Sequence, residues 1–476
     1  MKRARLSFAL LSSAVFLLTS CLKDDDKNVT YYEDTAITAF SVGTLKWSVD
    51  SVTKAGKDTV YQKKLEGKKY AFYIDQLKRE VYNPDSLPYG VDGKKVLCTI
   101  TSRNAGIVLL KSATSDSMKY YSNTDSIDFS QPRTFRVYSN SRQQYRDYTI
   151  RVNVHKQKPN DFKWTKLTEE PALGALTAMK AVVAKGKIYV FGQTGGGAKI
   201  YASATNDGKT WTQIVPTGLT LDADAYKNVA VQGDTLFLWN GGRLLKSVDA
   251  TTWTTIPTTG SAPQQLLGVS HSGFCFLGTD NLLYTLKRGE TEPTRETLNS
   301  GAGYLPVQDI SFVALPALAN DSTDQLLLFG NRTVDVDHPE STAMVWGKVA
   351  EYSKKATTTT QHWTRYIGLN PNLLPRLTHL QVVAYGRYLL AIGGDPLVGS
   401  KPAAFSQMYF SKDGGVTWYN NKIYTLPSTL SSSHTSFAMT VDADNYIWLV
   451  CGDSGQVWKV RKNSMGWTVP QTSFTK

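Results

Sequence analysis

The sequence predicts an all-β protein: an N-terminal β-sandwich of immunoglobulin-like type followed by a six-bladed β-propeller. Aromatic residues make up 11% and charged residues only 20% of the 476 residues, which favours strands over coiled coils. Short apolar runs alternate with turn clusters along the chain. A unit of about 50 residues recurs in the C-terminal two thirds. The hydrophobic content of 41% is enough for buried cores and excludes a wholly disordered chain.

Residues 1–20 have the features of a signal peptide. Three basic residues precede a mostly apolar run from Leu6 to Leu18, which is too short to span a bilayer. The following sequence, Leu-Thr-Ser-Cys at 18–21, resembles the bacterial lipobox, in which the cysteine is acylated. We therefore predict that Cys21 carries a lipid anchor. The alternative is an ordinary signal peptide with a cysteine there by chance.

Residues 21–33 are expected to form a flexible tether behind the lipid. Lys23, Asp24 and Asp25 resemble the lipoprotein export signal of Bacteroidetes-type bacteria. That resemblance implies a lipid-anchored protein of the cell outer membrane, exposed at the cell surface. The alternative is that this charged run is only a solvated spacer.

Residues 34–155 are predicted to form the β-sandwich. The clearest strand is 148–154, in which Tyr148, Ile150, Val152 and Val154 alternate with polar residues, as in a half-buried antiparallel strand. The turn cluster at 83–88 separates earlier runs. Because no Cys-Trp-Cys signature is present, an antibody-like topology is not predicted. A polar connector at 156–161 leads to the next domain.

Residues 162–476 contain the repeat that predicts the propeller. Six nearly continuous apolar runs, each ending in glycine, indicate strands buried on both faces; they lie at 187–192, 235–241, 273–278, 325–330, 388–393 and 446–452. Four strands per unit at this period are typical of propeller blades. Tryptophans mark the outer strands, with Trp164 as an extra copy. Either the Trp164 strand or the Trp467 strand closes the ring, and a seven-bladed ring is the alternative.

One turn motif recurs before the outer strands. Its full form has Ser411, Asp413, Gly415, Thr417 and Trp418, and a second form has Asn206, Gly208 and Trp211. The pattern resembles the Asp-boxes of sialidase-like propellers, which implies a structural role: the Asp or Asn side chain accepts backbone N–H bonds and glycine permits positive φ. The Arg-Ile-Pro signature of sialidases is absent, so sialidase chemistry is not expected.

Few residues suggest catalysis or metal binding, and we predict no catalytic residue, no metal site and no cofactor. The chain has no H-E-x-x-H or C-x-x-C pattern. Cys98, Cys275 and Cys451 lie in apolar runs, where free cysteine behaves as a small buried hydrophobe. The acidic cluster of Asp335, Asp337 and Glu340 is compatible with a calcium loop, but a solvated insertion is favoured.

The net charge of +13 raises the possibility of a nucleic-acid partner. Three of these charges lie in the expected signal peptide. Residues 21–160 contain 23 basic and 16 acidic residues, a net of +7, and residues 161–476 carry only +3. The large domain is therefore nearly neutral, and we predict no nucleic-acid binding.

The ligand site is expected at the propeller mouth, in the loops before each first strand and after each second strand. Tyr226, Trp239 and Asp395 are candidate ligand-binding residues. The first hypothesis is a non-enzymatic binding or scaffold protein for a glycan or a surface protein. The alternative is a polysaccharide hydrolase or lyase, which would require paired carboxylates about 5–10 Å apart at the mouth.

Together, the lipobox, the Lys-Asp-Asp tether, the sandwich with its 82–88 segment and the Asp-box propeller resemble an uncharacterised Bacteroidetes-type surface lipoprotein family. The resemblance covers nearly the whole chain. It implies an N-terminal domain of unknown function before the propeller and a cell-surface location. It implies no activity, so no catalytic residue is transferred.

Overall fold

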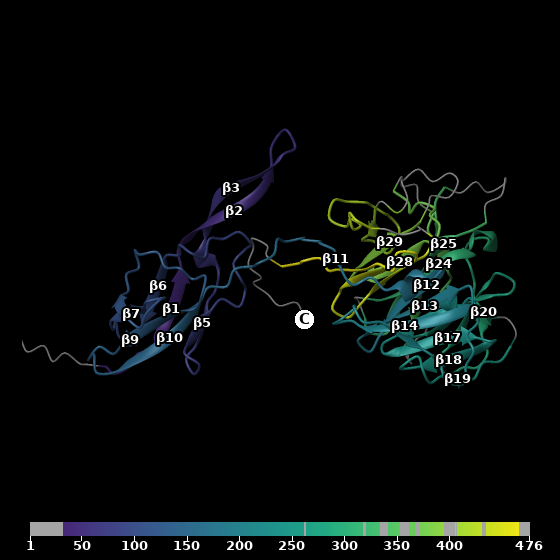
Figure 1. Ribbon diagram of the computed structural model, residues 1–476, viewed down its shortest axis with the longest axis horizontal. Coiled ribbons are helices and arrows are strands. Elements are labelled where there is room, and N and C mark those ends of the chain that lie inside the picture. The colour runs from purple at the N-terminus through teal and green to yellow at the C-terminus, as the bar shows by residue number, and fades with distance from the viewer. Residues whose placement is uncertain are drawn as a thin grey trace, which may run out of the picture. The chain divides into compact units, whose positions relative to one another are not determined.

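The computed structural model describes residues 32–260, 263–317, 320–333, 341–352, 361–367, 372–394, 405, 407–430 and 435–465. They fall into two compact units: residues up to Pro159 together with those after Lys462, and residues Asn160–Lys462 (Figure 1). Several predicted features lie outside the described residues, namely Cys21, Lys23, Asp24, Asp25, the acidic cluster at 335–340, Asp395 and Trp467. No helix within the described ranges is long and apolar enough to cross a membrane.

The described residues of the first unit form ten strands. A six-stranded sheet has the order β4 (Tyr73–Asp75), β5 (Glu80–Tyr82), β10 (Tyr145–Arg151), β9 (Arg133–Tyr138), β7 (Val108–Lys111) and β8 (Met118–Tyr120). Strands β1 (Ile37–Val42) and β6 (Cys98–Ser102) form a second sheet. Strands β2 (Thr44–Val52) and β3 (Asp58–Glu66) form a hairpin, and the 3-10 turn η1 (Gly67–Lys69) follows it. Strands β5 and β10 pair in parallel, whereas the other pairs in this unit are antiparallel.

The expected alternation in β10 is present and explains its place in the core. Tyr148 and Ile150 are completely buried, whereas Arg151 is exposed. The Tyr148 hydroxyl donates a hydrogen bond of 2.7 Å to Gln76 Oε1, which satisfies the buried phenol. The immunoglobulin-like topology stays a prediction, since a parallel strand pair lies beside β10 in the described sheet.

A buried asparagine joins the 83–88 turn to the segment after β10. Asn83 is fully buried, and its Oδ1 accepts a 2.7 Å hydrogen bond from the Asn153 amide. Its Nδ2 donates to the carbonyls of Asp85 and Asn153. The Asn83 side chain thus supplies hydrogen bonds in place of backbone strand pairing just beyond the end of β10.

The described residues of the second unit form six sheets, and the first five of them have consecutive strand order. The strands of the first three sheets are β12 (Ala178–Ala184), β13 (Lys187–Thr194), β14 (Gly197–Ala204) and β15 (Thr212–Ile214); β16 (Val229–Gln232), β17 (Thr235–Asn240), β18 (Arg243–Ser247) and β19 (Thr254–Ile256); and β20 (Pro263–Val269), β21 (Gly273–Gly278), β22 (Leu283–Lys287) and β23 (Thr294–Arg295).

The other three sheets complete the unit. They contain β24 (Gln308–Pro316), β25 (Thr323–Asn331), β26 (Met344–Glu351) and β27 (Thr364–Arg365); β28 (Gln381–Tyr385), β29 (Tyr388–Ile392) and β30 (Tyr409–Ser411); and β31 (Phe437–Val441), β32 (Ile447–Cys451), β33 (Val457–Val460) and β11 (Thr165–Lys166). Short helical turns α2 (Pro171–Gly174), η2 (Ala225–Asn228) and η3 (Ala302–Tyr304) precede three of the sheets.

The six sheets form a closed ring. The first strands β12, β16, β20, β24, β28 and β31 each contact the next one, and β31 contacts β12. Strand β11 pairs with β33, with Thr165 opposite Lys459, so a strand from the start of the unit completes its last sheet. The sequence left open whether the strand at Trp164 or the strand at Trp467 closes the ring. In the described residues, the strand next to Trp164 closes it.

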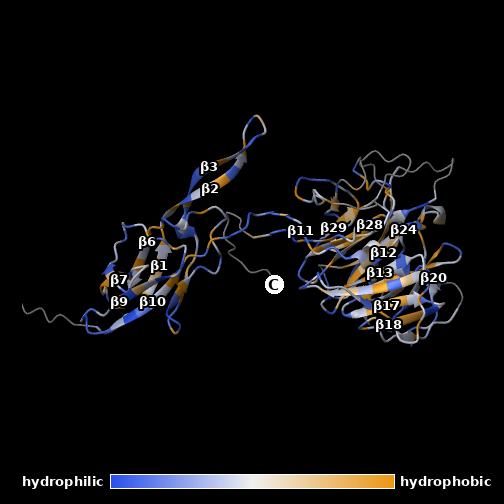
Figure 2. Ribbon diagram, viewed as in Figure 1, coloured by the Kyte–Doolittle hydropathy of each residue, from blue (hydrophilic) through white to orange (hydrophobic). Residues whose placement is uncertain are grey.

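The continuous apolar runs are the second strands of the sheets, as expected. All six residues of β21 and all five of β32 are buried. Figure 2 shows apolar residues concentrated on the strands of this unit, while the connecting turns are mostly hydrophilic. A side chain at Gly192 or Gly393 would collide with Leu176 or Leu377, which precede the first strands of the same sheets. Glycine therefore ends these runs because another chain segment packs there.

The Ser411–Trp418 turn has the hydrogen bonds that its sequence motif predicts. The Asp413 carboxylate accepts from the Thr417 amide at 2.9 Å, and the Ser411 hydroxyl accepts from the Gly415 amide at 2.9 Å. The Trp418 indole donates to the Gly415 carbonyl and packs edge-on against Phe329. The turn therefore fixes a buried tryptophan between strands.

The turn before Trp211 differs from the prediction. Asp207, not Asn206, accepts the Thr210 amide hydrogen bond, at 2.8 Å. The amides of Asp207 and Gly208 both donate to the Ala204 carbonyl. In the turn that these bonds form, the side chain of residue 207 accepts the Thr210 amide bond. The prediction that Asn206 plays the aspartate's part is therefore wrong.

The three described cysteines are free and buried, which confirms the expectation of small buried hydrophobes. Burial raises the pKa of the Cys98 thiol to about 11, although Tyr121 partly offsets this shift. Burial also raises the pKa of Cys275. Both thiols are therefore protonated and unreactive at neutral pH.

Candidate ligand site in the propeller channel

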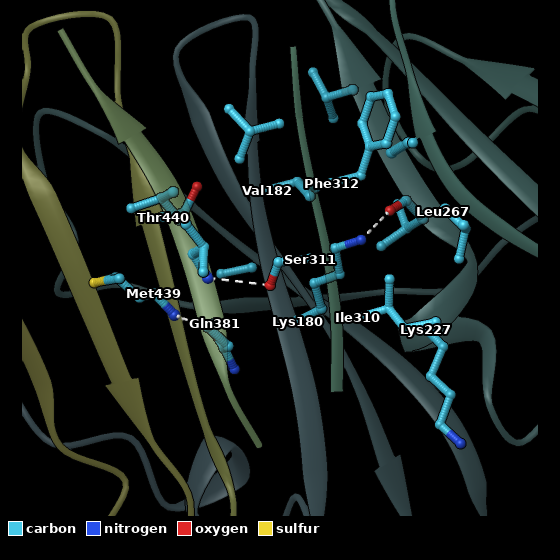
Figure 3. Close-up of a pocket in the computed structure, with 18 of the residues that line it drawn as sticks. Lys180, Val182, Lys227, Leu267, Ile310, Ser311, Phe312, Gln381, Met439 and Thr440 are labelled. Atoms are coloured by element: carbon cyan, nitrogen blue, oxygen red, sulfur yellow. Dashed lines mark hydrogen bonds between the residues drawn. The ribbon is translucent and has the colours of Figure 1, made fainter. Parts of the chain in front are cut away.

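The first strands of the six sheets surround a cavity of about 690 Å³, here called the channel (Figure 3). All six of these strands contribute to its lining. Cavities of a few hundred cubic ångströms typically hold small-molecule ligands. The channel is therefore the candidate functional site of this unit.

Side chains in or just before one first strand bond to the backbone in or just before the neighbouring first strand around the channel, and we call these contacts the interblade bonds. Lys180 Nζ donates to the Val229 carbonyl at 2.8 Å, and Asn228 Oδ1 accepts from the Leu266 amide at 3.0 Å. Ser311 Oγ accepts from the Val382 amide at 3.0 Å.

Three further interblade bonds, from Gln381 and Ser436, complete this series. Gln381 Nε2 donates to the Phe437 carbonyl, and its Oε1 accepts from the Met439 amide, each at 2.7 Å. Ser436 Oγ donates to the Leu176 carbonyl at 2.6 Å. Each of these bonds joins the beginnings of two neighbouring first strands, so these beginnings gather at one end of the channel. We call this end the mouth.

The remaining junction, between β20 and β24, is joined at the other end of the channel. The carboxylate of Asp324 is almost completely buried and accepts from His271 Nδ1 at 3.0 Å and from the His271 amide at 3.1 Å. The exposed imidazole stacks on Tyr352, with ring centroids 4.9 Å apart. Because all its described contacts tie two sheets together, this pair has a structural role.

The mouth carries two residues in the left-handed backbone region. Asp309 and His379 both have φ of 51°, which is uncommon for residues other than glycine. Their side chains lie 3.9 Å apart, between Oδ1 and Nδ1, and Asn331 Nδ2 donates to Asp309 Oδ2 at 2.9 Å. Such backbone strain is frequent at binding sites, where the surrounding structure holds it in place.

Lys180 makes one of the interblade bonds at the mouth. Strand β12 begins at Ala178, and Figure 3 shows Lys180 on the channel wall among Ser311 and Gln381. Its side chain keeps limited exposure to the channel, and burial lowers the pKa of its amine to about 8. The amine is therefore mostly protonated at pH 7.

Two of the three predicted ligand-binding residues can be located. Tyr226 lines the channel at the mouth, in η2, and burial together with the nearby carboxylates of Asp224 and Asp309 raises its pKa. Trp239 is 7% exposed and packs against Phe276 in the core between two sheets, so it does not line the channel. Its prediction is wrong because the second strands are buried on both faces.

Sequence reasoning missed Lys180, although a signal was present. Within Ala-Met-Lys-Ala-Val-Val-Ala of β12, it is the only charged residue. A single charged side chain in an apolar strand either has a hydrogen-bonding partner nearby or takes part in binding or catalysis. Only the closed ring brings this position into the channel.

The described lining has no pair of acidic groups suited to glycoside hydrolysis. Its acidic residues are Asp309 and Asp324. Asp324 lies opposite Pro316 in the sheet, seven residues beyond Asp309 along β24, so the two are roughly 23 Å apart. The described residues also contain no group of three or more His, Cys, Asp or Glu side chains that could hold a metal ion.

The ring of sheets around a channel defines a β-propeller protein. Residues 158–470 match the model described as DUF6242 beta propeller domain, and residues 40–152 match the Domain of unknown function (DUF6242) N-terminal domain. The chain therefore belongs to the DUF6242 family. This confirms the expected order of an N-terminal domain of unknown function and a C-terminal propeller. No curated protein matches the sequence significantly.

Similar solved structures are distant. A calcium-bound structure of a family AA12 carbohydrate-active enzyme of Trichoderma reesei is 12% identical and has a TM-score of 0.36, with 63% of this chain and 95% of that chain covered. A quinonprotein alcohol dehydrogenase-like protein of Bacteroides thetaiotaomicron is 8% identical, with a TM-score of 0.31 and 80% and 91% covered. A family 117 glycoside hydrolase of Zobellia galactanivorans is 11% identical, with a TM-score of 0.29 and 64% and 91% covered. None of these similarities carries an argument about function.

Proposed function

We propose that this protein is a lipid-anchored surface lipoprotein that binds a glycan in the propeller channel without cleaving it. The observation that carries the proposal is the channel itself: about 690 Å³, lined by polar side chains from several sheets, with strained residues at its mouth. A few polar groups placed in a preformed cavity are the usual means of recognising small polar ligands.

The size of the cavity favours a glycan over a folded protein partner. A specific protein–protein interface buries about 800 Å² on each partner, usually on a broad surface. A cavity of this volume instead encloses a small molecule or the end of a chain. We therefore prefer one or two sugar rings as the occupant.

The separation of the acidic residues favours binding over hydrolysis. Carboxylates of glycosidases lie about 5–10 Å apart, whereas Asp309 lies near the start of β24 and Asp324, in β25, lies opposite the other end of β24. The described lining thus supports recognition without an acid–base pair.

Glycan-array binding by the chain from Leu22 onward, which keeps both units, tests the ligand proposal. Replacing Tyr226 with alanine should abolish most of the array signal, because this ring lines the mouth. Tyr120→Ala, on an exposed strand of the first unit, is the matched control and should bind normally. An array signal insensitive to Tyr226→Ala contradicts the channel as the site, and release of reducing sugar contradicts the non-enzymatic part.

The surface location is tested separately in cells. Replacing Lys23, Asp24 and Asp25 with alanine should retain the protein on the inner side of the outer membrane, and Cys21→Ser should release it from membranes altogether. Protease treatment of intact cells reports the first effect. Equal digestion of the wild type and the triple variant contradicts the export signal.

A further inference from the structure

Lys180 differs from the other side chains that make interblade bonds at the mouth, because its side chain is ionisable. Asn228, Ser311, Gln381 and Ser436 make the equivalent contacts with neutral amide or hydroxyl groups. A neutral side chain is therefore sufficient to join neighbouring first strands. Placing an ammonium group here costs desolvation energy that the structural role does not require.

The described surroundings of Lys180 provide no counter-charge. Of the elements packed against β12, strands β16 and β31 have no ionisable side chain. Strand β13 carries Lys187, opposite Ala184 at the far end of β12, and Tyr189, whereas η2 carries Tyr226 and Lys227. No acidic side chain of the described residues forms an ion pair with Lys180.

The acidic residue that lines the channel at the mouth, Asp309, is already engaged. Asp309 accepts a hydrogen bond from Asn331 and lies beside His379. The ammonium group of Lys180 has three donors, of which the structure assigns one, to the Val229 carbonyl. Two donors are thus left for a group that enters the channel.

We propose that the channel binds the carboxylate of an acidic sugar and that the ammonium group of Lys180 is its counter-charge. This inference rests on the proposed glycan-binding function and names the class of sugar. Lys227, exposed at the mouth, adds attraction for an entering anion. A charge-assisted hydrogen bond inside a cavity is also stronger than the same contact in water.

The depressed pKa of Lys180, about 8, gives the proposal a pH signature. The ammonium form is present at pH 7 and disappears as the pH rises above about 8, while the sugar carboxylate stays ionised. Affinity for an acidic sugar should therefore fall between about pH 7 and about pH 9.5. Neutral sugars should show no such dependence.

Calorimetric titration of the chain from Leu22 onward with galacturonic acid, glucuronic acid, galactose and glucose tests the inference. Acetate and sulfate are added as separate arms, to distinguish an acidic sugar from a free anion. The variants are Lys180→Gln, which keeps a hydrogen-bond donor without the charge, and Lys180→Arg, which keeps a charge that does not titrate. Lys246→Gln, exposed on β18, is the control.

We expect uronic acids to bind at least about 10-fold more tightly than neutral sugars, and Lys180→Gln to remove this preference. Lys180→Arg should retain uronic-acid binding up to about pH 9.5, and Lys246→Gln should behave as the wild type. The retention by arginine distinguishes a charge from a purely structural contact.

Three outcomes overturn the inference. Neutral and acidic sugars binding equally well, with Lys180→Gln unchanged, would refute it and leave the proposed function intact. Acetate or sulfate binding as tightly as the uronic acids would refute the acidic sugar as the ligand. If none of the sugars binds, the inference fails, and the proposed function fails with it only if the glycan array is also negative or insensitive to Tyr226→Ala.

Discussion

Lys180 is an ionisable residue in a mostly apolar strand of the propeller. Its amine is buried in the channel wall, with one carbonyl as its described hydrogen-bond partner. Functional sites often retain such groups at the expense of stability. The channel could not be predicted from the sequence, because the closing contact between β31 and β12 joins segments about 260 residues apart.

Replacing Lys180 with methionine should therefore stabilise the protein at pH 7. A pKa lowered from 10.5 to about 8 means that the folded protein holds the amine proton less tightly than the unfolded chain. Removing the charge should raise the free energy of unfolding by about 1–3 kcal/mol, after the lost hydrogen bond is counted. Urea unfolding measures the change, with Lys246→Met as the control; a destabilised Lys180→Met would point to a purely structural lysine.

The lowered pKa of Lys180 also determines how the stability of the wild-type protein changes with pH. Between about pH 8 and about pH 10.5, the unfolded chain binds a proton at this site and the folded protein does not. The contribution of Lys180 to stability therefore increases with pH across this window. Comparison with Lys180→Met isolates that contribution, because the variant lacks the titrating group.

The turn before Trp211 gives a second prediction at the residue scale. Asp207→Ala should lower the thermal midpoint, because Asp207 accepts the Thr210 amide, whereas Asn206→Ala should leave it unchanged. The sequence motif assigned Asn206 to the accepting position. The motif specifies the spacing of the turn, but it does not specify which of the two adjacent polar residues accepts the backbone hydrogen bond. Thermal unfolding followed by tryptophan fluorescence compares the two variants; a larger effect at Asn206 would restore the sequence-based assignment.

At the scale of elements, the second strands were the most predictable feature. Their continuous apolar runs follow from burial on both faces, and β21 and β32 are buried throughout. The order of strands in the first unit was not predictable, because its short strands of similar character allow several pairings, including the parallel pair β5 and β10.

The closing strand β11 should be critical for the stability of the ring. The Leu167 amide donates to the Val457 carbonyl at 2.8 Å, next to the two paired residues of β11. Leu167→Pro removes this donor and should lower the thermal midpoint by several degrees while increasing hydrogen exchange in β33. Unchanged exchange in β33 would mean that β11 contributes little to closure.

The three turns that end at Trp211, Trp253 and Trp418 predict a shared acid sensitivity. In the turn before Trp253, the amides of Thr251 and Thr252 donate to the Asp249 carboxylate at 2.8 and 2.9 Å. Hydrogen bonds from backbone amides lower the pKa of Asp207 and of Asp249, and bonds from Thr417 and Ser411 outweigh burial to lower that of Asp413. Because each carboxyl is more acidic in the folded state, its stabilisation is complete above the unfolded pKa of about 3.9 and is lost as the pH falls through the lower folded value.

Replacing all three aspartates with asparagine should therefore flatten the acid limb of the stability curve. The wild type should lose more stability than the variant between about pH 5 and about pH 2. Chemical unfolding at a series of pH values measures both curves. Parallel curves would show that these turns do not contribute to acid sensitivity.

At the scale of the whole molecule, the sequence predicted the division into a β-rich N-terminal unit and a propeller, and the family match agrees with it. Charge counting correctly located the excess of lysine and arginine in the first unit, but it gave no information on the channel, where one lysine matters more than the net charge. A ligand site at the mouth was expected from the sequence, because loops at one end of a propeller converge whatever their sequence, and that site stays a proposal.

A crystal structure of the chain from Leu22 onward with the glycan that binds best on the array tests the central claim most directly. We expect electron density for the sugar inside the channel, with an oxygen within hydrogen-bond distance of Lys180 Nζ and a ring near Tyr226. Density for the sugar on the outer strands or on the first unit, with an empty channel, would contradict it.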